Sequence, residues 1–212
     1  MPAFPRWNAR LHNHWATTGG RLPDTNVLVV YPVDALYGLA DTRADRMAAD
    51  VFTLLLALVG AHSQPDVLSP TVAARGRWKD GKFMIGRHAY DAIILPYQPA
   101  PRKELNALLR RHEKQVLHVT SSPLVAAAFL ASLDERRVPR PVRGPAQTWV
   151  SATQAERSTI VTVIASRHGG HVEGTLEYGG VAIRLPRTGG RVTVRFRQGE
   201  TPVILSEGDL SK

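Results

Sequence analysis

Serine and histidine side chains that could form a hydrolase pair occur in the central part of the chain. Ser121 and Ser122 follow an apolar segment at 115–120 (QVLHVT), which contains His118. A serine becomes a nucleophile when a histidine accepts its proton, so Ser121 or Ser122 with a histidine such as His88 or His118 is a candidate pair, with Ser121 as the first candidate. No glycine-bracketed elbow of the GxSxG kind surrounds these serines. A nucleophile elbow needs such small residues for its sharp turn. Because they are missing here, the serine nucleophile is kept only as an alternative.

Other residue types argue against metal and paired-carboxylate chemistry. The chain has no cysteine, which removes disulfides, thiolate metal sites and cysteine nucleophiles. His12 and His14 would point to different faces of a helix, and His168 and His171 flank one predicted turn. Two histidines without a third ligand do not predict a metal site. No pair of carboxylates on a recognisable scaffold predicts a glycosidase, so we expect neither chemistry.

The segment 75–86 (RGRWKDGKFMIG) contains part of a phosphate-binding loop pattern. Its glycines and lysine have the required spacing, but Phe83 stands where the pattern needs a serine or threonine. A nucleotide site is therefore rejected, and no cofactor of any kind is expected. The Asp-Gly dipeptide at 80–81, flanked by aromatic and aliphatic residues, predicts a β-hairpin instead.

Apolar patterning predicts the elements that would position these residues. Two short apolar runs, 27–30 and 91–95, are each followed closely by a proline and are typical of strands buried on both faces. Helical spacing of apolar residues predicts helices over about 5–18, 41–60, 101–112 and 123–133, and further strands are expected at 66–68 and 115–120. This alternation predicts an α/β fold with a mainly parallel sheet and flanking helices.

The carboxyl end of the first predicted strand is the expected functional edge. Open α/β sheets bind ligands and partners beyond the carboxyl ends of their strands. Tyr31, Pro32, Asp34 and Tyr37 follow the strand at 27–30, in a segment predicted to be a loop that leads into a helix. They are candidate ligand or interface residues. The alternative is that the tyrosines only cover the edge of the core.

Two tryptophans mark a second candidate interface. Trp7 and Trp15 lie on the apolar face of the predicted helix at 5–18. Aromatic side chains are common anchors of interfaces, so we expect self-association or an apolar patch at this helix or at the sheet edge. The alternative is that both tryptophans pack as ordinary core.

The pattern changes in the C-terminal third of the chain. Residues 136–145 are rich in proline and arginine and predict an exposed linker or edge segment. Beyond them, runs at 172–178, 181–185 and 192–196 alternate apolar and polar residues and are separated by Gly-Gly pairs. These runs predict a small antiparallel β module with one face in solvent. The predicted domains are 1–140 and 141–212.

Composition bounds the class of protein. The 212 residues are 43% hydrophobic and carry a formal net charge of +9, without a block of five consecutive like charges. This charge permits weak polyanion binding but does not indicate a nucleic-acid partner. Arg6 and Arg10 interrupt any signal-peptide pattern, and the longest apolar stretch, 51–61, is too short to span a bilayer. We expect a soluble chain of unspecified compartment.

The order of several sequence segments resembles that of a known protein family. NVLVVYPVDALY at 26–37, the apolar helix, the hairpin and YDAIILP at 90–96 are similar to the glutamine-amidotransferase-like, or trimerisation-like, domain of large glycoside hydrolases. Family 42 β-galactosidases and rhamnosidase-like hydrolases contain such a domain after a catalytic barrel. The resemblance covers about residues 4–133, and GETPVIL at 199–205 is loosely similar to the tails of these hydrolases. It implies a flavodoxin-like, class I glutamine-amidotransferase-like fold.

Departures from that family shape the functional hypothesis. The hydrolases carry their catalytic carboxylates in the barrel, and the amidotransferases use a cysteine where this chain has Thr120, Ser121 and Ser122. The resemblance therefore implies a non-catalytic accessory or interaction module of a glycoside-hydrolase-like protein, as a fragment or detached C-terminal part. Its partner would be a catalytic barrel domain or a second subunit, and a homo-oligomer is a further candidate. The alternatives are a small serine-dependent hydrolase and a basic polyanion-binding protein.

Overall fold

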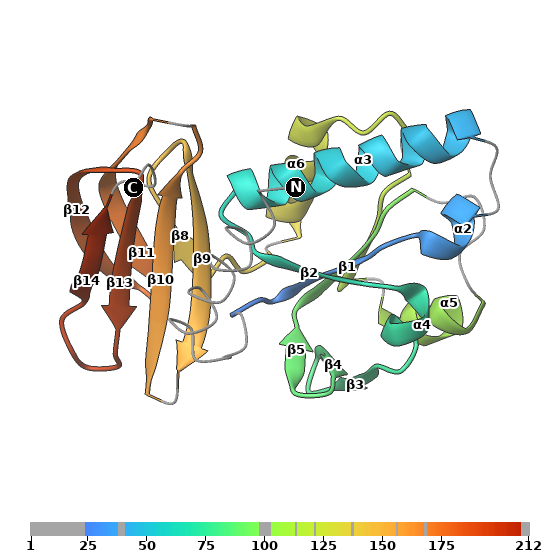
Figure 1. Ribbon diagram of the computed structural model, residues 1–212. Helices are drawn as coiled ribbons and strands as arrows, with labels where there is room; N and C mark the ends of the chain where they lie inside the picture. Colours follow the sequence, from blue (N-terminus) through green and yellow to red (C-terminus); the bar gives the residue numbers. More distant parts are fainter. Residues whose placement is uncertain are drawn as a thin grey trace, which may run out of the picture. The chain divides into compact units, whose positions relative to one another are not determined.

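The computed structural model describes residues 24–37, 41–97, 103–112, 114–120, 122–136, 138–155, 157–167 and 169–208. They belong to two compact units, shown in Figure 1. One unit is Thr25–Pro141, and the other combines Val142–Lys212 with the N-terminal residues up to Asp24. Trp7, Trp15 and Ser121 lie outside the described residues, so the expectations that rest on them stay predictions.

A parallel sheet of four strands forms the centre of the unit Thr25–Pro141. Its strands, in the spatial order β2-β1-β6-β7, are β2 (Pro65–Leu68), β1 (Val27–Val30), β6 (Ala92–Leu95) and β7 (Val116–His118). Val27 lies opposite Pro65 on one side and Ala92 on the other, both in parallel register. The predicted adjacency of the two buried runs in one sheet is therefore confirmed, as is the α/β class in general.

Each face of this sheet has its own apolar core. Val27 and Val29 pack with the helices α3 (Asp41–Gly60) and α6 (Ala126–Glu135), whereas Leu28 and Val30 face the opposite side. Figure 1 shows α3 and α6 over one face, with α4 (Pro70–Ala73), α5 (Lys103–Leu109) and the small sheet β3-β4-β5 over the other. Successive side chains of a strand point to opposite faces, so a strand covered on both sides must be apolar at every position.

The small antiparallel sheet contains the predicted hairpin. It consists of β3 (Arg77–Lys79), β4 (Lys82–Ile85) and a third strand that was not predicted, β5 (His88–Tyr90). Asp80 and Gly81 both have positive φ, 52° and 76°, as a two-residue type I′ turn requires. Trp78 fixes the hairpin, because its indole N–H donates to the Leu108 carbonyl at 3.2 Å and its ring stacks on His112 in the 3-10 helix η1 (Arg110–His112).

The segment after β1 differs from the prediction. A short helix, α2 (Val33–Tyr37), stands where a loop was expected. The carbonyl of Pro32 accepts hydrogen bonds from the N–H groups of Ala35 and Leu36, both at 3.1 Å. Proline lacks an N–H group, which a residue at the start of a helix does not need, so Pro32 ends the strand and starts the helical turn.

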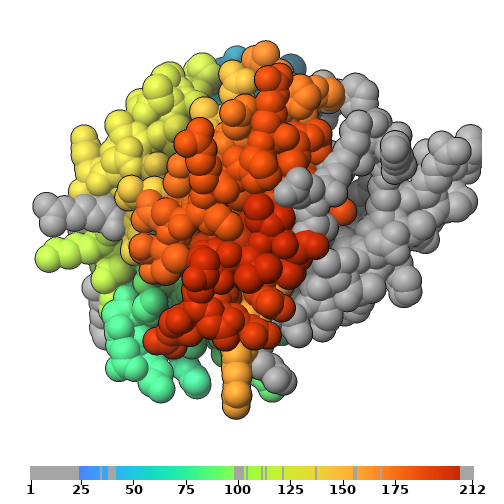
Figure 2. Space-filling model, turned by 90° about the vertical axis from the view of Figure 1, so that its left-hand side faces the viewer, coloured from blue at the N-terminus to red at the C-terminus, as the bar shows by residue number. Residues whose placement is uncertain are grey.

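The second unit is a β-sandwich of two antiparallel sheets. One sheet has the order β14-β13-β10-β9 and the other β12-β11-β8. The strands are β8 (Val142–Arg143), β9 (Thr148–Ala155), β10 (Ser158–Ala165), β11 (His171–Tyr178), β12 (Val181–Gly189), β13 (Arg191–Phe196) and β14 (Val203–Gly208). In the space-filling view of Figure 2, the residues of the C-terminal strands, in orange and red, form a continuous surface.

A single apolar cluster fills the sandwich. The first sheet contributes Val161, Val163 and Val192 among others, and the second contributes Leu176 and Leu185, all fully or nearly fully buried. The predicted small antiparallel β module was incomplete, because β9 and β10 were not recognised as a strand pair. The segment 136–145 contains β8, an edge strand whose Val142 is buried, which agrees with the edge rather than the linker interpretation.

Within the described ranges, no helix has the length and apolarity needed to cross a membrane.

Candidate functional site

The predicted edge of the parallel sheet carries three tyrosines in the structure. Tyr31 is partly buried directly after β1, Pro32 is buried, and Tyr37 at the end of α2 is 89% exposed. The backbone of Asp34 lies in α2. Tyr97, which follows the neighbouring strand β6, is 40% exposed and was missed by sequence reasoning. The role of these residues in binding stays a prediction.

The loop after β7 is held by a buried carboxylate. Asp50 of α3 is only 6% exposed, and it accepts hydrogen bonds from the Ser122 hydroxyl at 2.6 Å and the Leu124 N–H group at 2.7 Å. Hydrogen bonds to a charged acceptor offset the desolvation of a buried carboxylate. The Ser122 hydroxyl thus donates to a carboxylate and not to the imidazole that usually accepts the proton of a serine nucleophile.

The two histidines of the alternative hydrolase hypothesis lie in different surroundings. His118 is exposed on β7. The Nδ1 atom of His88 lies 3.6 Å from the Asp66 carboxylate, which also accepts a 2.7 Å hydrogen bond from the Tyr90 hydroxyl. Burial raises the pKa of Tyr90 well above its usual value, and the Asp66 carboxylate raises this pKa further. The Asp66 carboxylate therefore keeps the Tyr90 hydroxyl protonated, and the contacts of His88 and Tyr90 with Asp66 connect β5 to β2.

Space and metal ligands near these residues are limited. A hollow of about 110 Å³ lies beside β7 and α6, lined by His118, Thr120 and Ser132 among others. Ligand pockets usually measure roughly 300–1,000 Å³, so this hollow is too small for a substrate. Over the part of the chain that the structure describes, no three His, Asp or Glu side chains are grouped to hold a metal ion.

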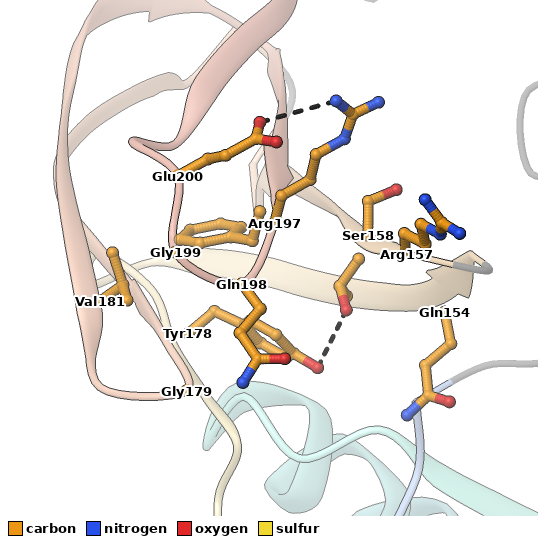
Figure 3. A pocket seen from close by; sticks show the side chains of 12 residues that line it. Gln154, Arg157, Ser158, Tyr178, Gly179, Val181, Arg197, Gln198, Gly199 and Glu200 are labelled. Atoms are coloured by element: carbon orange, nitrogen blue, oxygen red, sulfur yellow. Dashed lines mark hydrogen bonds and ion pairs between the residues drawn. The ribbon is translucent and has the colours of Figure 1, made fainter.

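A much larger pocket of about 860 Å³ lies at one end of the β-sandwich (Figure 3). Three chain reversals contribute to it, namely those between β9 and β10, between β11 and β12, and between β13 and β14. The lining residues are Gln154, Arg157, Ser158, Thr159, Tyr178, Gly179, Val181, Phe196, Arg197, Gln198, Gly199 and Glu200.

A hydrogen-bond network fixes the floor of this sandwich pocket. The Tyr178 hydroxyl donates to the Asp24 carboxylate at 2.5 Å and accepts from the Thr159 hydroxyl at 3.1 Å. The Gln154 amide donates to the other Asp24 oxygen at 2.9 Å. The Tyr178 ring lies against Phe196, with ring centroids 5.4 Å apart and a tilt of 54°. The ring is therefore held at both its edge and its hydroxyl.

The same surroundings alter the acidity of Tyr178. Burial raises the pKa of Tyr178 to about 12, and the Asp24 acceptor acts in the same direction while the Thr159 hydroxyl opposes it. Tyr178 is consequently neutral and a hydrogen-bond donor at all physiological pH values.

The rim of the pocket is rich in cationic and amide groups. Arg157 is exposed in the turn between β9 and β10. The guanidinium of Arg197 lies 3.6 Å from the Glu200 carboxylate, in the reversal between β13 and β14. The amide side chain of Gln198 also lines the pocket (Figure 3). Sequence reasoning missed this pocket because its residues come from separate turns. The Gly-Gly pair at 179–180 identified one of these reversals, but only as a turn and not as part of a site.

Comparisons with known proteins give a likeness of structure alone. No protein-family model and no curated protein matches the sequence. Gan42B, a GH42 β-galactosidase, has a TM-score of 0.47 with 9% identity, over 82% of this chain and 40% of the other. A cold-adapted β-galactosidase from Rahnella sp. R3 has a TM-score of 0.46 with 10% identity, over 89% of this chain and 42% of the other. The chain thus spans about two fifths of each structure, and such low scores carry no argument about function.

Proposed function

We propose that the chain is a non-catalytic accessory module of a glycoside-hydrolase-like protein. The observation that carries the proposal is the contact of Asp50 with the loop after β7. In the amidotransferases that the sequence resembles, this loop bears the nucleophile. Here, a buried carboxylate engages the Ser122 hydroxyl and the Leu124 N–H group, which supports a structural role for the loop.

A partner surface is proposed at the carboxyl edge of the parallel sheet. Tyr37 and Tyr97 are exposed there, and Tyr31 is partly exposed. Tyrosine offers a large amphipathic contact area and is enriched at interfaces. The proposed partner is a catalytic barrel domain or a second subunit, and a second copy of this chain is the simplest case to examine.

The test measures turnover by the purified full chain. We expect no release of nitrophenol from aryl glycosides or short-chain esters above the buffer rate, for the wild type and for Ser122→Ala alike. Glycoside turnover that a single Asp or Glu substitution abolishes would contradict the proposal. Ester turnover lost in Ser121→Ala or in Ser122→Ala would instead favour the serine hydrolase.

Sedimentation over a range of concentrations examines the partner surface. If a second copy binds at the sheet edge, Tyr37→Ser should lower the sedimentation coefficient at high concentration. Val203→Ser is the matched control, because Val203 is also exposed, at 44%, but lies in β14 of the sandwich. Equal effects of the two substitutions would argue against an interface at Tyr37.

A further inference from the structure

We propose that the sandwich pocket binds a short saccharide that carries a carboxylate group. That the ligand is a saccharide rests on the proposed function, whereas the carboxylate rests on the charges of the pocket itself. The volume of about 860 Å³ falls within the usual range of ligand pockets, roughly 300–1,000 Å³.

The charged groups of the rim favour an anionic ligand. Among the described residues that line the pocket, Glu200 is the single carboxylate, and it already lies 3.6 Å from Arg197. The Asp24 carboxylate at the floor already accepts from the Tyr178 hydroxyl and the Gln154 amide. Arg157 lines the same pocket and has no carboxylate within ion-pair distance among the described residues, so its guanidinium is uncompensated within that part of the chain. A guanidinium binds a carboxylate through two parallel N–H donors, which gives both attraction and a fixed orientation.

The uncharged groups suit a ring with several hydroxyls. Gln154 and Gln198 present amides, which both donate and accept, and Ser158 adds a hydroxyl. The Tyr178 ring provides an apolar surface among these polar groups. A sugar ring combines hydroxyls at its edge with C–H groups on its faces, so an aromatic surface surrounded by amides and hydroxyls complements it.

The floor of the pocket is ordered before any ligand arrives. The bonds from Thr159 to Tyr178 and from Tyr178 to Asp24 hold the aromatic ring, and Phe196 supports it from the core. A binding surface that is already rigid loses little conformational entropy on binding. Arg157 and Gln198, on turns, are the groups that would adjust to the ligand.

Titration calorimetry with the full chain tests the proposal, using α-1,4-linked digalacturonate as the acidic probe and α-1,4-galactobiose, which has the same linkage, as its neutral counterpart. We expect digalacturonate to bind at least about tenfold more tightly, since a hydrogen-bonded charge pair is worth about that factor or more. Arg157→Gln should remove this preference. Arg167→Gln is the matched control, because Arg167 is also exposed but follows the opposite end of β10. It should bind both probes as the wild type does.

Three results would overturn the proposal: no digalacturonate binding by the wild type, equal weakening in Arg157→Gln and Arg167→Gln, or displacement of digalacturonate by an equal concentration of inorganic phosphate. The second would indicate attraction by net charge, and the third a site for any anion. Each sample is also analysed for cleaved disaccharide. Cleavage would contradict the non-catalytic function, whereas absence of binding without cleavage contradicts the pocket alone.

Discussion

Tyr178 joins the core of the sandwich to the floor of its pocket. Its ring packs on Phe196, and its hydroxyl lies between Thr159 and Asp24. Burial is the main reason that its pKa rises to about 12, from about 10 in an unfolded chain. Between these two pH values the unfolded chain has lost the proton that the folded chain retains. Stability from this group is therefore complete below about pH 10 and is lost as the pH rises to 12.

The Tyr178→Phe variant tests this linkage. Below about pH 10 we expect it to be less stable than the wild type, because Asp24 loses a hydrogen-bond donor. The difference in the free energy of unfolding should shrink as the pH rises from 10 to 12. Urea denaturation at a series of pH values measures it, with Tyr37→Phe as the control, since Tyr37 is 89% exposed. A difference that is constant with pH would contradict the role of the Tyr178 proton.

Single residues of the pocket could not be predicted from the sequence. Arg157, Arg197 and Tyr178 are unremarkable in their local patterns, and only the pairing of distant strands brings them together. By contrast, Tyr31 and Pro32 were placed correctly at the end of β1, because a buried strand followed by proline is a local signal.

At the scale of elements, Asp50 fastens the helix α3 to the loop before α6. The carboxylate binds the Ser122 hydroxyl and the Leu124 N–H group, which lie far along the chain from α3. In Asp50→Ala, both donors lose their charged acceptor, and the partly buried N–H group of Leu124 is left without this acceptor.

We expect Asp50→Ala to lower the free energy of unfolding by roughly 2–4 kcal/mol. Asp45→Ala is the matched control, because Asp45 is exposed on the same helix and should change stability little. Guanidinium denaturation of both variants provides the measurement. Similar stability of the two variants would show that the buried bonds contribute nothing net.

Elements with a strong local period were predictable, and elements defined by tertiary contacts were not. The Asp-Gly turn requires two residues of positive φ, which that dipeptide favours, so the β3–β4 hairpin followed from sequence alone. The helix α2 has only five residues, too few to show a helical period. The strands β9 and β10 contain many threonines and serines on both faces, so apolar alternation did not reveal them.

At the scale of the whole molecule, the chain contains separate apolar cores. Leu176 belongs to the core of the sandwich, and Leu58 to the helix-covered face of the parallel sheet, and both are fully buried. The clusters have no residue in common. In the sequence, the hydrophobic period changes from helical spacing to alternation between the two regions, and the predicted domains 1–140 and 141–212 stay predictions.

Two cavity-forming substitutions test whether the cores unfold separately. Leu176→Ala and Leu58→Ala should each cost about 2–5 kcal/mol in their own unit. In differential scanning calorimetry we therefore expect two transitions, with Leu176→Ala lowering the midpoint of one and Leu58→Ala that of the other. Leu56→Ala, at a half-exposed position of α3, is the control and should shift neither midpoint strongly. A single transition that both core substitutions lower equally would mean that the units unfold as one cooperative body.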